Sequence, residues 1–290
     1  MTRMKLLPLA AAAVASLLFV AGCSTKTTLT LGLPAINGVV VYLKASGAQP
    51  ARTEADVTVD GTRLVPVVAI NSDTVDLINY SGEGEYMWSS TWRSDNLNVL
   101  PGKECQLKVF QSDGEASSPK LMLPAGFSIT APAESSRLAR GSPLTITWPA
   151  VTGIDRYEVT VTIDYSYYDT SHYFQHFALD TSFAVSKDTL AVTFAAGTVF
   201  PPDVDSVRSG YGSISVTAEA GPNIGHESKG NISGNGIGYF WTRTSDDVLI
   251  LFGIADVRNA RGRSERQSAR QVLAEKQRRL REVGKPTRVS

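Results

Sequence analysis

Two histidines lie four residues apart in an aromatic-rich stretch of the chain. Residues 165–177 read YSYYDTSHYFQHF and contain His172 and His176 with the spacing H-x-x-x-H. On a helix these side chains would share one face, one turn apart, and could bind one metal ion. On a strand they would lie roughly 13 Å apart, too far for a single ion. The local secondary structure therefore decides which chemistry this stretch can support.

The residues around the histidines alternate with period two. Apolar or aromatic side chains take the six odd positions from 157 to 167, and polar side chains lie between them. This pattern predicts a strand, a turn at residues 169–171 and a returning strand. We expect Tyr165 and Tyr167 to be buried, and Tyr173 to rejoin the core side. The side chains expected on the outward face are Tyr168, His172, Phe174 and His176.

Three interpretations of this outward face are open. It is an exposed strand face without a specific ligand, a binding surface or, with the least support, a metal site. The binding interpretation has a physical basis, because exposed amphipathic rings often mark interaction sites. Aromatic side chains on such a face can stack on sugars or anchor a partner protein, and the sequence does not separate these two ligands.

Sequence signatures of enzymes are absent. His226-Glu227 is followed by Ser-Lys-Gly rather than by x-x-His, and no G-x-S-x-G occurs. The glycines of GNGIG (234–238) lack the dinucleotide-loop spacing and indicate a loop or close strand packing. The acidic pairs at 201–206 and 246–247 lack the alternating oxygen ligands of a calcium loop. We therefore expect a protein that is not an enzyme and has no cofactor and no metal.

The elements that position the outward face are strands. Period-two patterning runs from about residue 28 to 240, which predicts a mainly β chain of short strands. Asp60-Gly61 predicts a tight hairpin between residues 57–59 and 62–70. Cys105 shares one side of an alternating strand with Leu107 and Val109, so we expect a buried thiol without a disulfide partner.

The first residues form an export signal. Arg3 and Lys5 precede an apolar stretch at residues 6–20 that is too short to span a bilayer comfortably. The motif Val20-Ala21-Gly22-Cys23 resembles the lipobox of bacterial lipoproteins, and this resemblance implies that Cys23 is acylated and becomes the mature N-terminus. The alternative is an ordinary secretory signal with a chance cysteine.

The lipobox resemblance also implies a place in the cell. Ser24, rather than aspartate, follows the cysteine, which in Gram-negative lipoproteins favours the outer membrane. We therefore expect a protein of the cell envelope whose acyl chains, palmitate among them, hold it to the membrane. Nucleic acid is not an expected partner of an exported chain.

The second half of the chain resembles a known class of sandwich domain. The stretch FSITAPAESSRLARGSPLTITWPAVTGIDRYEVTV (127–161) is similar to the opening of bacterial Ig-like and fibronectin type III-like modules, and SISVTAEAGPNIGHES (213–228) to their penultimate strand. The resemblance implies that Trp148 and Tyr157 are core residues, with Ile214, Val216 and Ala218 inward. Gly212 stands where the family has a tyrosine.

The C-terminal residues have a different composition. Residues 254–290 carry 11 basic and 4 acidic side chains, whereas residues 24–253 carry 15 basic and 24 acidic ones. This tail is predicted to form a basic helix that either is solvated or contacts an anionic envelope polymer, lipid or partner protein. The candidate contact residues are Arg263, Arg266, Arg270, Lys276, Arg278, Arg279 and Arg281.

Together these patterns predict two tandem antiparallel β-sandwich domains. The expected segments are a signal peptide at 1–22, a lipidated tether at 23–33, sandwiches at 34–124 and 125–252, and the basic tail at 253–290. Whether residues 245–253 form a last strand or enter the tail helix is open. The expected function is that of a lipid-anchored binding or structural module of the envelope, or a carbohydrate-binding or enzyme-accessory module that uses the 165–177 face.

Overall fold

The chain folds into β-sandwich layers. A computed structural model describes residues 33–45, 49–62, 65–82, 88–223 and 230–253. The predicted signal sequence, Cys23 and the basic tail from Arg263 to Arg281 lie outside these ranges, so the predictions made for them stay predictions. The described residues contain no helix that is long and apolar enough to cross a membrane.

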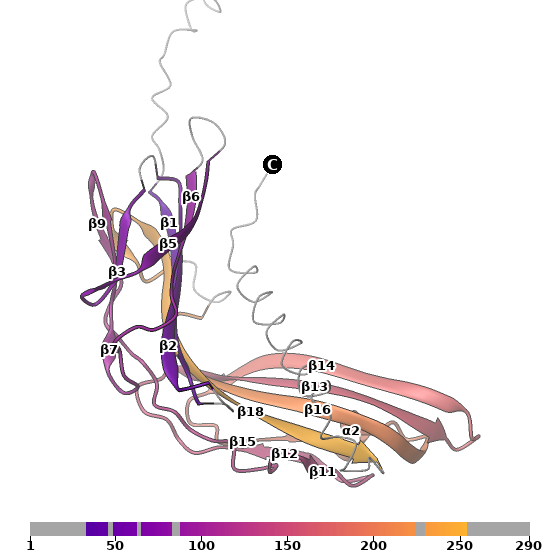
Figure 1. The fold of residues 1–290 in the computed structure, drawn as a ribbon. Helices are drawn as coiled ribbons and strands as arrows, with labels where there is room; N and C mark the ends of the chain where they lie inside the picture. The colour runs from indigo at the N-terminus through magenta and orange to yellow at the C-terminus, as the bar shows by residue number, and fades with distance from the viewer. Residues whose placement is uncertain (1–32, 46–48, 63–64, 83–87, 224–229, 254–290) are drawn as a thin grey trace, which may run out of the picture. The chain divides into compact units, whose positions relative to one another are not determined.

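The first sandwich has two main layers, whose strands Figure 1 draws mostly in indigo to purple, with those from the end of the described chain in orange. One layer is part of a nine-stranded sheet, and the other is a five-stranded sheet formed by β17, β9, β8, β3 and β4 in that order. The strands of this half are β1 (Ala35–Leu43), β2 (Arg52–Asp60), β3 (Val67–Ile70), β4 (Asp73–Thr74), β5 (Asp76–Gly82), β6 (Trp88–Ser94), β7 (Glu104–Cys105), β8 (Leu107–Gln111), β9 (Gly114–Ser117), β10 (Leu121–Met122) and, from the end of the described chain, β17 (Ser233–Gly234).

The second sandwich places four long strands against a smaller layer. The long strands continue the nine-stranded sheet in the order β14-β13-β16-β18, and β12 pairs with β15 on the other side. The elements of this half are β11 (Ser136–Arg137), β12 (Leu144–Thr147), β13 (Arg156–Asp169), β14 (Phe174–Ser186), β15 (Ala191–Phe194), α2 (Ala196–Val199), β16 (Val204–Ala220) and β18 (Ile237–Gly253).

Strand β18 belongs to both sandwiches. Its first half pairs with β1 in parallel, and its second half pairs with β16 antiparallel. Phe240 lies in the first core, whereas Val248, Ile250 and Phe252 lie in the second. The first sandwich is thus completed by residues that lie, in the sequence, between β16 and the second half of β18, both of which belong to the second sandwich. The apolar run at 245–253 is a strand in this structure, which answers the question that the sequence left open.

Close packing of β18 on β1 depends on glycine. A Cβ at Gly238 would lie 1.8 Å from the carbonyl oxygen of Ile36, and the residue has φ +144°. A Cβ at Gly38 would lie 3.2 Å from the Phe240 side chain of β18 and 2.8 Å from the Leu107 side chain of the opposite sheet. The interpretation of the GNGIG glycines as close strand packing is therefore confirmed at Gly238.

The second core contains the residues that the Ig-like resemblance implied. Trp148 and Tyr157 are buried and contact each other edge to face, with ring centroids 5.4 Å apart. Ile214, Val216 and Ala218 are fully buried, as expected. Gly212 has no space for the tyrosine of the family pattern, because its Cβ would lie 2.8 Å from the Ile250 side chain. The side chains of Ile250 and Phe252 from β18 fill the space beside Gly212 instead.

Two predictions for the first sandwich have opposite outcomes. Cys105, Leu107 and Val109 are buried on one side of the β7–β8 region, as predicted. The tight hairpin at Asp60-Gly61 is wrong, because β2 pairs with β1 and β6 whereas β3 pairs with β4 and β8 in the other sheet. Gly61 does adopt a positive φ of 87°, but the chain there crosses between layers rather than returning beside itself.

Candidate binding surface

The turn between β13 and β14 is organised by one carboxylate. Asp169 Oδ1 accepts hydrogen bonds from the backbone N–H groups of Ser171 and Tyr173, each at 2.9 Å. Asp169 Oδ2 accepts a third from Gln175 Nε2 at 3.1 Å. The bond from the Tyr173 N–H is the largest of the effects that lower the pKa of Asp169. Three donors on one ionised group give the turn a defined shape.

Strand pairing brings two rings together on the outward face. Tyr168 of β13 lies directly opposite Phe174 of β14, and their ring centroids are 5.8 Å apart at 70°. Arg208, from β16, donates a hydrogen bond from Nη1 to the Tyr168 hydroxyl at 2.9 Å. Phe174 is 60% exposed. The outward face therefore presents an apolar ring beside a hydrogen-bonded phenol and a cation.

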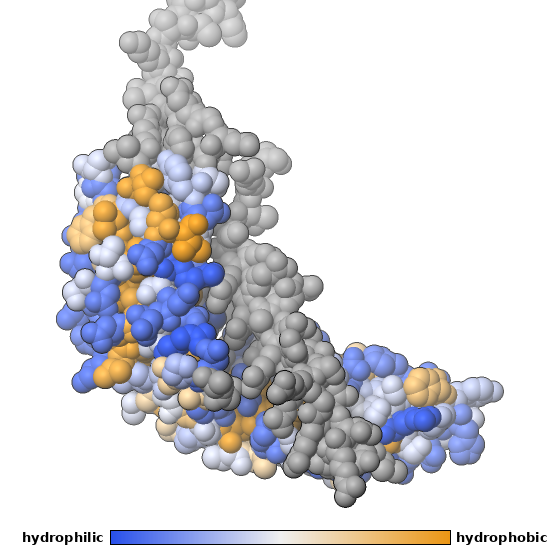
Figure 2. Space-filling view, viewed as in Figure 1, coloured by the Kyte–Doolittle hydropathy of each residue, from blue (hydrophilic) through white to orange (hydrophobic). Residues whose placement is uncertain are grey.

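His176 lies on the same face, two residues along β14 from Phe174. It is opposite Ser166, and its Nε2 is 2.9 Å from Asp164 Oδ1. Both side chains are about half exposed, so solvent screens this pair. We call the set Tyr168, Phe174, His176, Asp164 and Arg208 the aromatic surface. Figure 2 shows hydrophobic side chains near the end of the second sandwich that carries the β13–β14 hairpin.

The aromatic surface rests on a rigid, buried layer. Tyr165 donates a hydrogen bond to the carbonyl oxygen of Val199 at 2.8 Å and stacks on Phe252 with centroids 4.9 Å apart. Burial raises the pKa of the Tyr165 phenol. Tyr167 is buried beside it. The two tyrosines predicted to lie in the core do so, and they hold β13 beneath the outward rings.

The structure changes the expected positions of two residues. His172 does not lie on the strand face: it is in the turn, with φ +62°, and its N–H donates to the Asp169 carbonyl. Tyr173 does not rejoin the core side and is 69% exposed. Both differ because β14 begins only at Phe174, so residues 170–173 follow the turn and not the alternation. The two histidines accordingly do not share a helical face.

Metal ligands are not gathered in the described part of the chain, where no group of three or more His, Cys, Asp or Glu side chains is placed to hold an ion. Asp246, from one of the acidic pairs considered for calcium, has other partners. Its Oδ1 lies 2.6 Å from Lys44 Nζ, and its Oδ2 accepts the Ile129 N–H at 2.7 Å. Asp246 thus ties the two sandwiches to each other.

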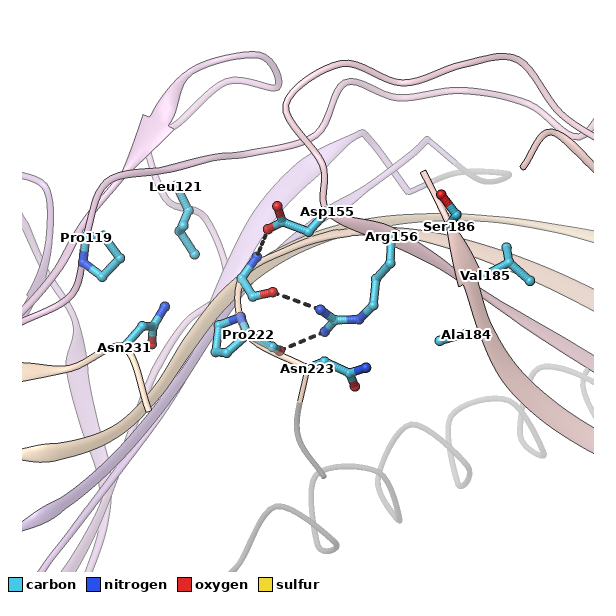
Figure 3. Close-up of a pocket in the computed structure, with 11 residues that line it drawn as sticks. Pro119, Leu121, Asp155, Arg156, Ala184, Val185, Ser186, Pro222, Asn223 and Asn231 are labelled. Carbon is cyan, nitrogen blue, oxygen red and sulfur yellow. Dashed lines mark hydrogen bonds between the residues drawn. The ribbon is translucent and has the colours of Figure 1, made fainter. Parts of the chain in front are cut away.

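A buried ion-pair cluster lies beside a shallow groove of about 640 Å³. Glu219 of β16 is flanked in register by Arg156 of β13 and Arg243 of β18, at 2.8 Å and 3.2 Å. Arg156 also donates to the carbonyl oxygens of Gly221 and Pro222, as Figure 3 shows. Both terminal nitrogens of Arg156 are therefore engaged within the protein, and the cluster serves structure rather than ligand binding.

Sequence reasoning missed Arg208 and the Glu219 cluster. Arg208 reaches Tyr168 because β16 has a register shift opposite residues 166–167, which turns one extra side chain outward. Glu219 and its arginines come from three strands that are distant in sequence. Neither arrangement leaves a local pattern, because alternation reports which face a residue occupies and not which residue lies beside it.

Comparisons with known proteins do not assign this chain to a family. No family model matches the chain, and no curated protein matches it. Among 19 matching chains of solved structures are the full ectodomain (Ig1–Ig3) of mouse nectin-like molecule 4 and DIP-gamma IG1+IG2. The first has 12% identity and a TM-score of 0.22, and covers 77% of this chain and 66% of its own. The second has 14% identity and a TM-score of 0.18, and covers 74% and 97%. The strands and sheets of the described residues by themselves define a mainly β protein of sandwich architecture.

Proposed function

We propose that this protein is a lipid-anchored, non-enzymatic module of the bacterial cell envelope that binds a ligand through the aromatic surface. The observation that carries the binding role is the Tyr168–Phe174 ring pair with Arg208 bonded to the phenol. These groups come from three adjacent strands and are held by a buried tyrosine layer. A preformed surface of rings and a cation binds without a large ordering cost.

The anchoring part of the proposal rests on the sequence. The export signal ends in Val20-Ala21-Gly22-Cys23, and several acyl chains on one cysteine give durable attachment where one chain holds only marginally. Metabolic labelling with a palmitate analogue should mark the protein, and Cys23→Ser should remove both the label and partition into detergent. Labelling that persists in Cys23→Ser contradicts the anchor. Ser24 favours the outer membrane, which membrane fractionation tests.

The binding part is tested by capture of crosslinked envelope with the protein as bait. Tyr168→Ala with Phe174→Ala should abolish the specific capture, because it removes both rings and the partner of Arg208. Phe110→Ala is a matched control, since Phe110 is also an exposed aromatic, 41% exposed, on the other sandwich. Equal loss with the control, or unchanged capture with the double variant, contradicts the aromatic surface as the site.

Carbohydrate is the second candidate ligand class, and the neighbours of the rings favour it. On the outward face, the largely exposed Phe174 ring lies beside the His176 imidazole, the Asp164 carboxylate and Arg208. Exposed rings can pack on sugar C–H groups while planar polar side chains bond hydroxyls. Glycan addition should quench intrinsic fluorescence in the parent and not in Tyr168→Ala with Phe174→Ala. A flat response over an envelope glycan panel removes this candidate.

The tail from Arg263 to Arg281 is proposed to contact an anionic surface. Its excess of seven basic side chains contrasts with the acidic remainder of the mature chain. Binding of the protein to anionic vesicles should weaken as salt rises and should vanish when residues 254–290 are deleted. Neutral vesicles are the control, and unchanged binding by the deletion variant contradicts this role.

A further inference from the structure

Strand β14 ends the nine-stranded sheet with an open edge. All 13 of its residues pair with β13, and within the described ranges no strand pairs with its other edge. Every second residue therefore directs its backbone N–H and C=O away from the sheet. At the opposite end of the sheet, β5 has seven residues and a register shift between Leu77 and Asn79. Only β14 offers a long, regular edge.

The sequence of β14 lacks the features that usually prevent edge pairing. FQHFALDTSFAVS contains no lysine, arginine, proline or glycine, and Asp180 is its single carboxylate. Its core-side residues are only partly buried: Phe177, Leu179, Phe183 and Val185 pack against the second core from the rim. An additional strand along this edge would cover them.

The edge is complementary to itself about Thr181. If a second copy lies antiparallel with Thr181 opposite Thr181, Phe177 faces Val185 and Leu179 faces Phe183 on the core side. On the outward side Ala178 faces Ala184, and Asp180 faces the Ser182 hydroxyl. Aromatic with β-branched, threonine with threonine, and carboxylate with hydroxyl are favourable cross-strand pairs. No like charges meet.

Neighbouring registers are less favourable. A slip by one residue in pairing places core-side residues opposite outward ones. Centring the pair on Asp180 places two carboxylates opposite each other, which is destabilising. Centring it on Ser182 places Phe177 opposite Lys187. Of these registers, the Thr181 register is the one in which each of the nine residues from 177 to 185 faces a residue on the same side of the sheet, apolar opposite apolar and polar opposite polar.

We propose that two copies of this chain associate through their β14 edges, antiparallel and centred on Thr181, so that the two nine-stranded sheets become continuous. The backbone groups at the open edge then pair with each other, and the partly buried row from Phe177 to Val185 is covered. The two aromatic surfaces lie toward opposite ends of the shared strand pair. The ligand proposed above is independent of this pairing.

A cysteine at the symmetry axis tests the register directly. In the full chain, purified in detergent, Thr181→Cys places two thiols opposite each other with Cα atoms about 4.5–5.5 Å apart, within disulfide reach. Oxidised glutathione should convert most of this variant to a dimer on a non-reducing gel. Ser182→Cys is the matched control, because its two copies lie diagonally at about 7–8 Å and should crosslink far less. The parent chain shows any background from Cys23.

A charge variant tests whether the edge forms the interface without any crosslink. Ala178 and Ala184 are exposed, and Ala178→Lys with Ala184→Lys places lysines opposite lysines in the proposed register. Light scattering should give twice the chain mass for the parent and a single chain mass for the double variant, with circular dichroism showing that both are folded. A parent that is monomeric at high micromolar concentration, or equal crosslinking of Thr181→Cys and Ser182→Cys, overturns the proposal.

Discussion

The Glu219 carboxylate lies 2.8 Å from the Arg156 guanidinium, and the glutamate is only 4% exposed. Arg243 contacts the other oxygen of the same carboxylate at 3.2 Å and lies over the Trp241 ring. One acidic side chain thus pairs with two cations on the strands to either side of it. Where β18 passes from the first core to the second, this cluster fixes its lateral pairing.

Removal of Glu219 should destabilise the protein strongly. Glu219→Gln leaves two arginines without their shared anion in a largely dry site, and breaking such a buried pair costs about 3 kcal/mol of unfolding free energy. Urea unfolding at pH 7 measures it. The control is Glu104→Gln, whose ion pair with Lys120 is exposed and should be worth less than about 1 kcal/mol. Equal effects of the two changes would contradict the role of the cluster.

Cys105 should be unreactive in the folded protein. Burial raises the pKa of its thiol from 9.0 to about 12, so almost no thiolate exists at pH 8. A thiol reagent should label Cys105 in urea but not in buffer, and the Cys105→Ala variant should show whether any remaining signal comes from Cys23. Because the folded pKa is the higher one, this thiol's stabilising contribution is complete below pH 9 and is lost as the pH rises toward 12. Rapid labelling in buffer would show that the first core opens.

Asp169 should make the β13–β14 turn sensitive to acid. The backbone hydrogen bond from Tyr173 lowers the pKa of Asp169 below its ordinary value of 3.8. The ionised carboxylate therefore stabilises the folded protein above the ordinary carboxyl pKa, and this stabilisation is lost as the pH falls through the lowered pKa. Asp169→Ala should lower the urea midpoint at pH 7 and have less effect near pH 3. Asp188→Ala, at an exposed loop position, is the control and should change neither midpoint.

The sequence predicted which side of a sheet many of the side chains face. Alternation alone placed Tyr165 and Tyr167 in the core and Phe174 outside it, because a strand directs successive side chains to opposite sides. The same reasoning placed Cys105 correctly. It failed at Tyr173, where the backbone N–H groups of Ser171 and Tyr173 donate to the Asp169 carboxylate and the turn interrupts the alternation.

Neighbours across strands could not be predicted in the same way. The parallel pairing of β1 with β18 joins segments from opposite ends of the described chain, and no turn between them reveals it. The Asp60-Gly61 hairpin was wrong for the related reason that a tight-turn signal does not exclude a crossing between layers. Arg208 and Glu219 acquire their partners only from this long-range pairing.

Gly238 tests the parallel contact that the sequence did not reveal. Gly238→Ala puts a Cβ 1.8 Å from the Ile36 carbonyl oxygen at φ +144°, so β18 must move away from β1 or the backbone must distort. We expect a loss of at least about 2 kcal/mol of unfolding free energy. Gly197→Ala is the control, because nothing lies within 4 Å of its added Cβ, and it should change stability by less than about 0.5 kcal/mol. If the two alanine variants unfold at the same urea concentration, β18 does not pack on β1 as closely as this structure has it.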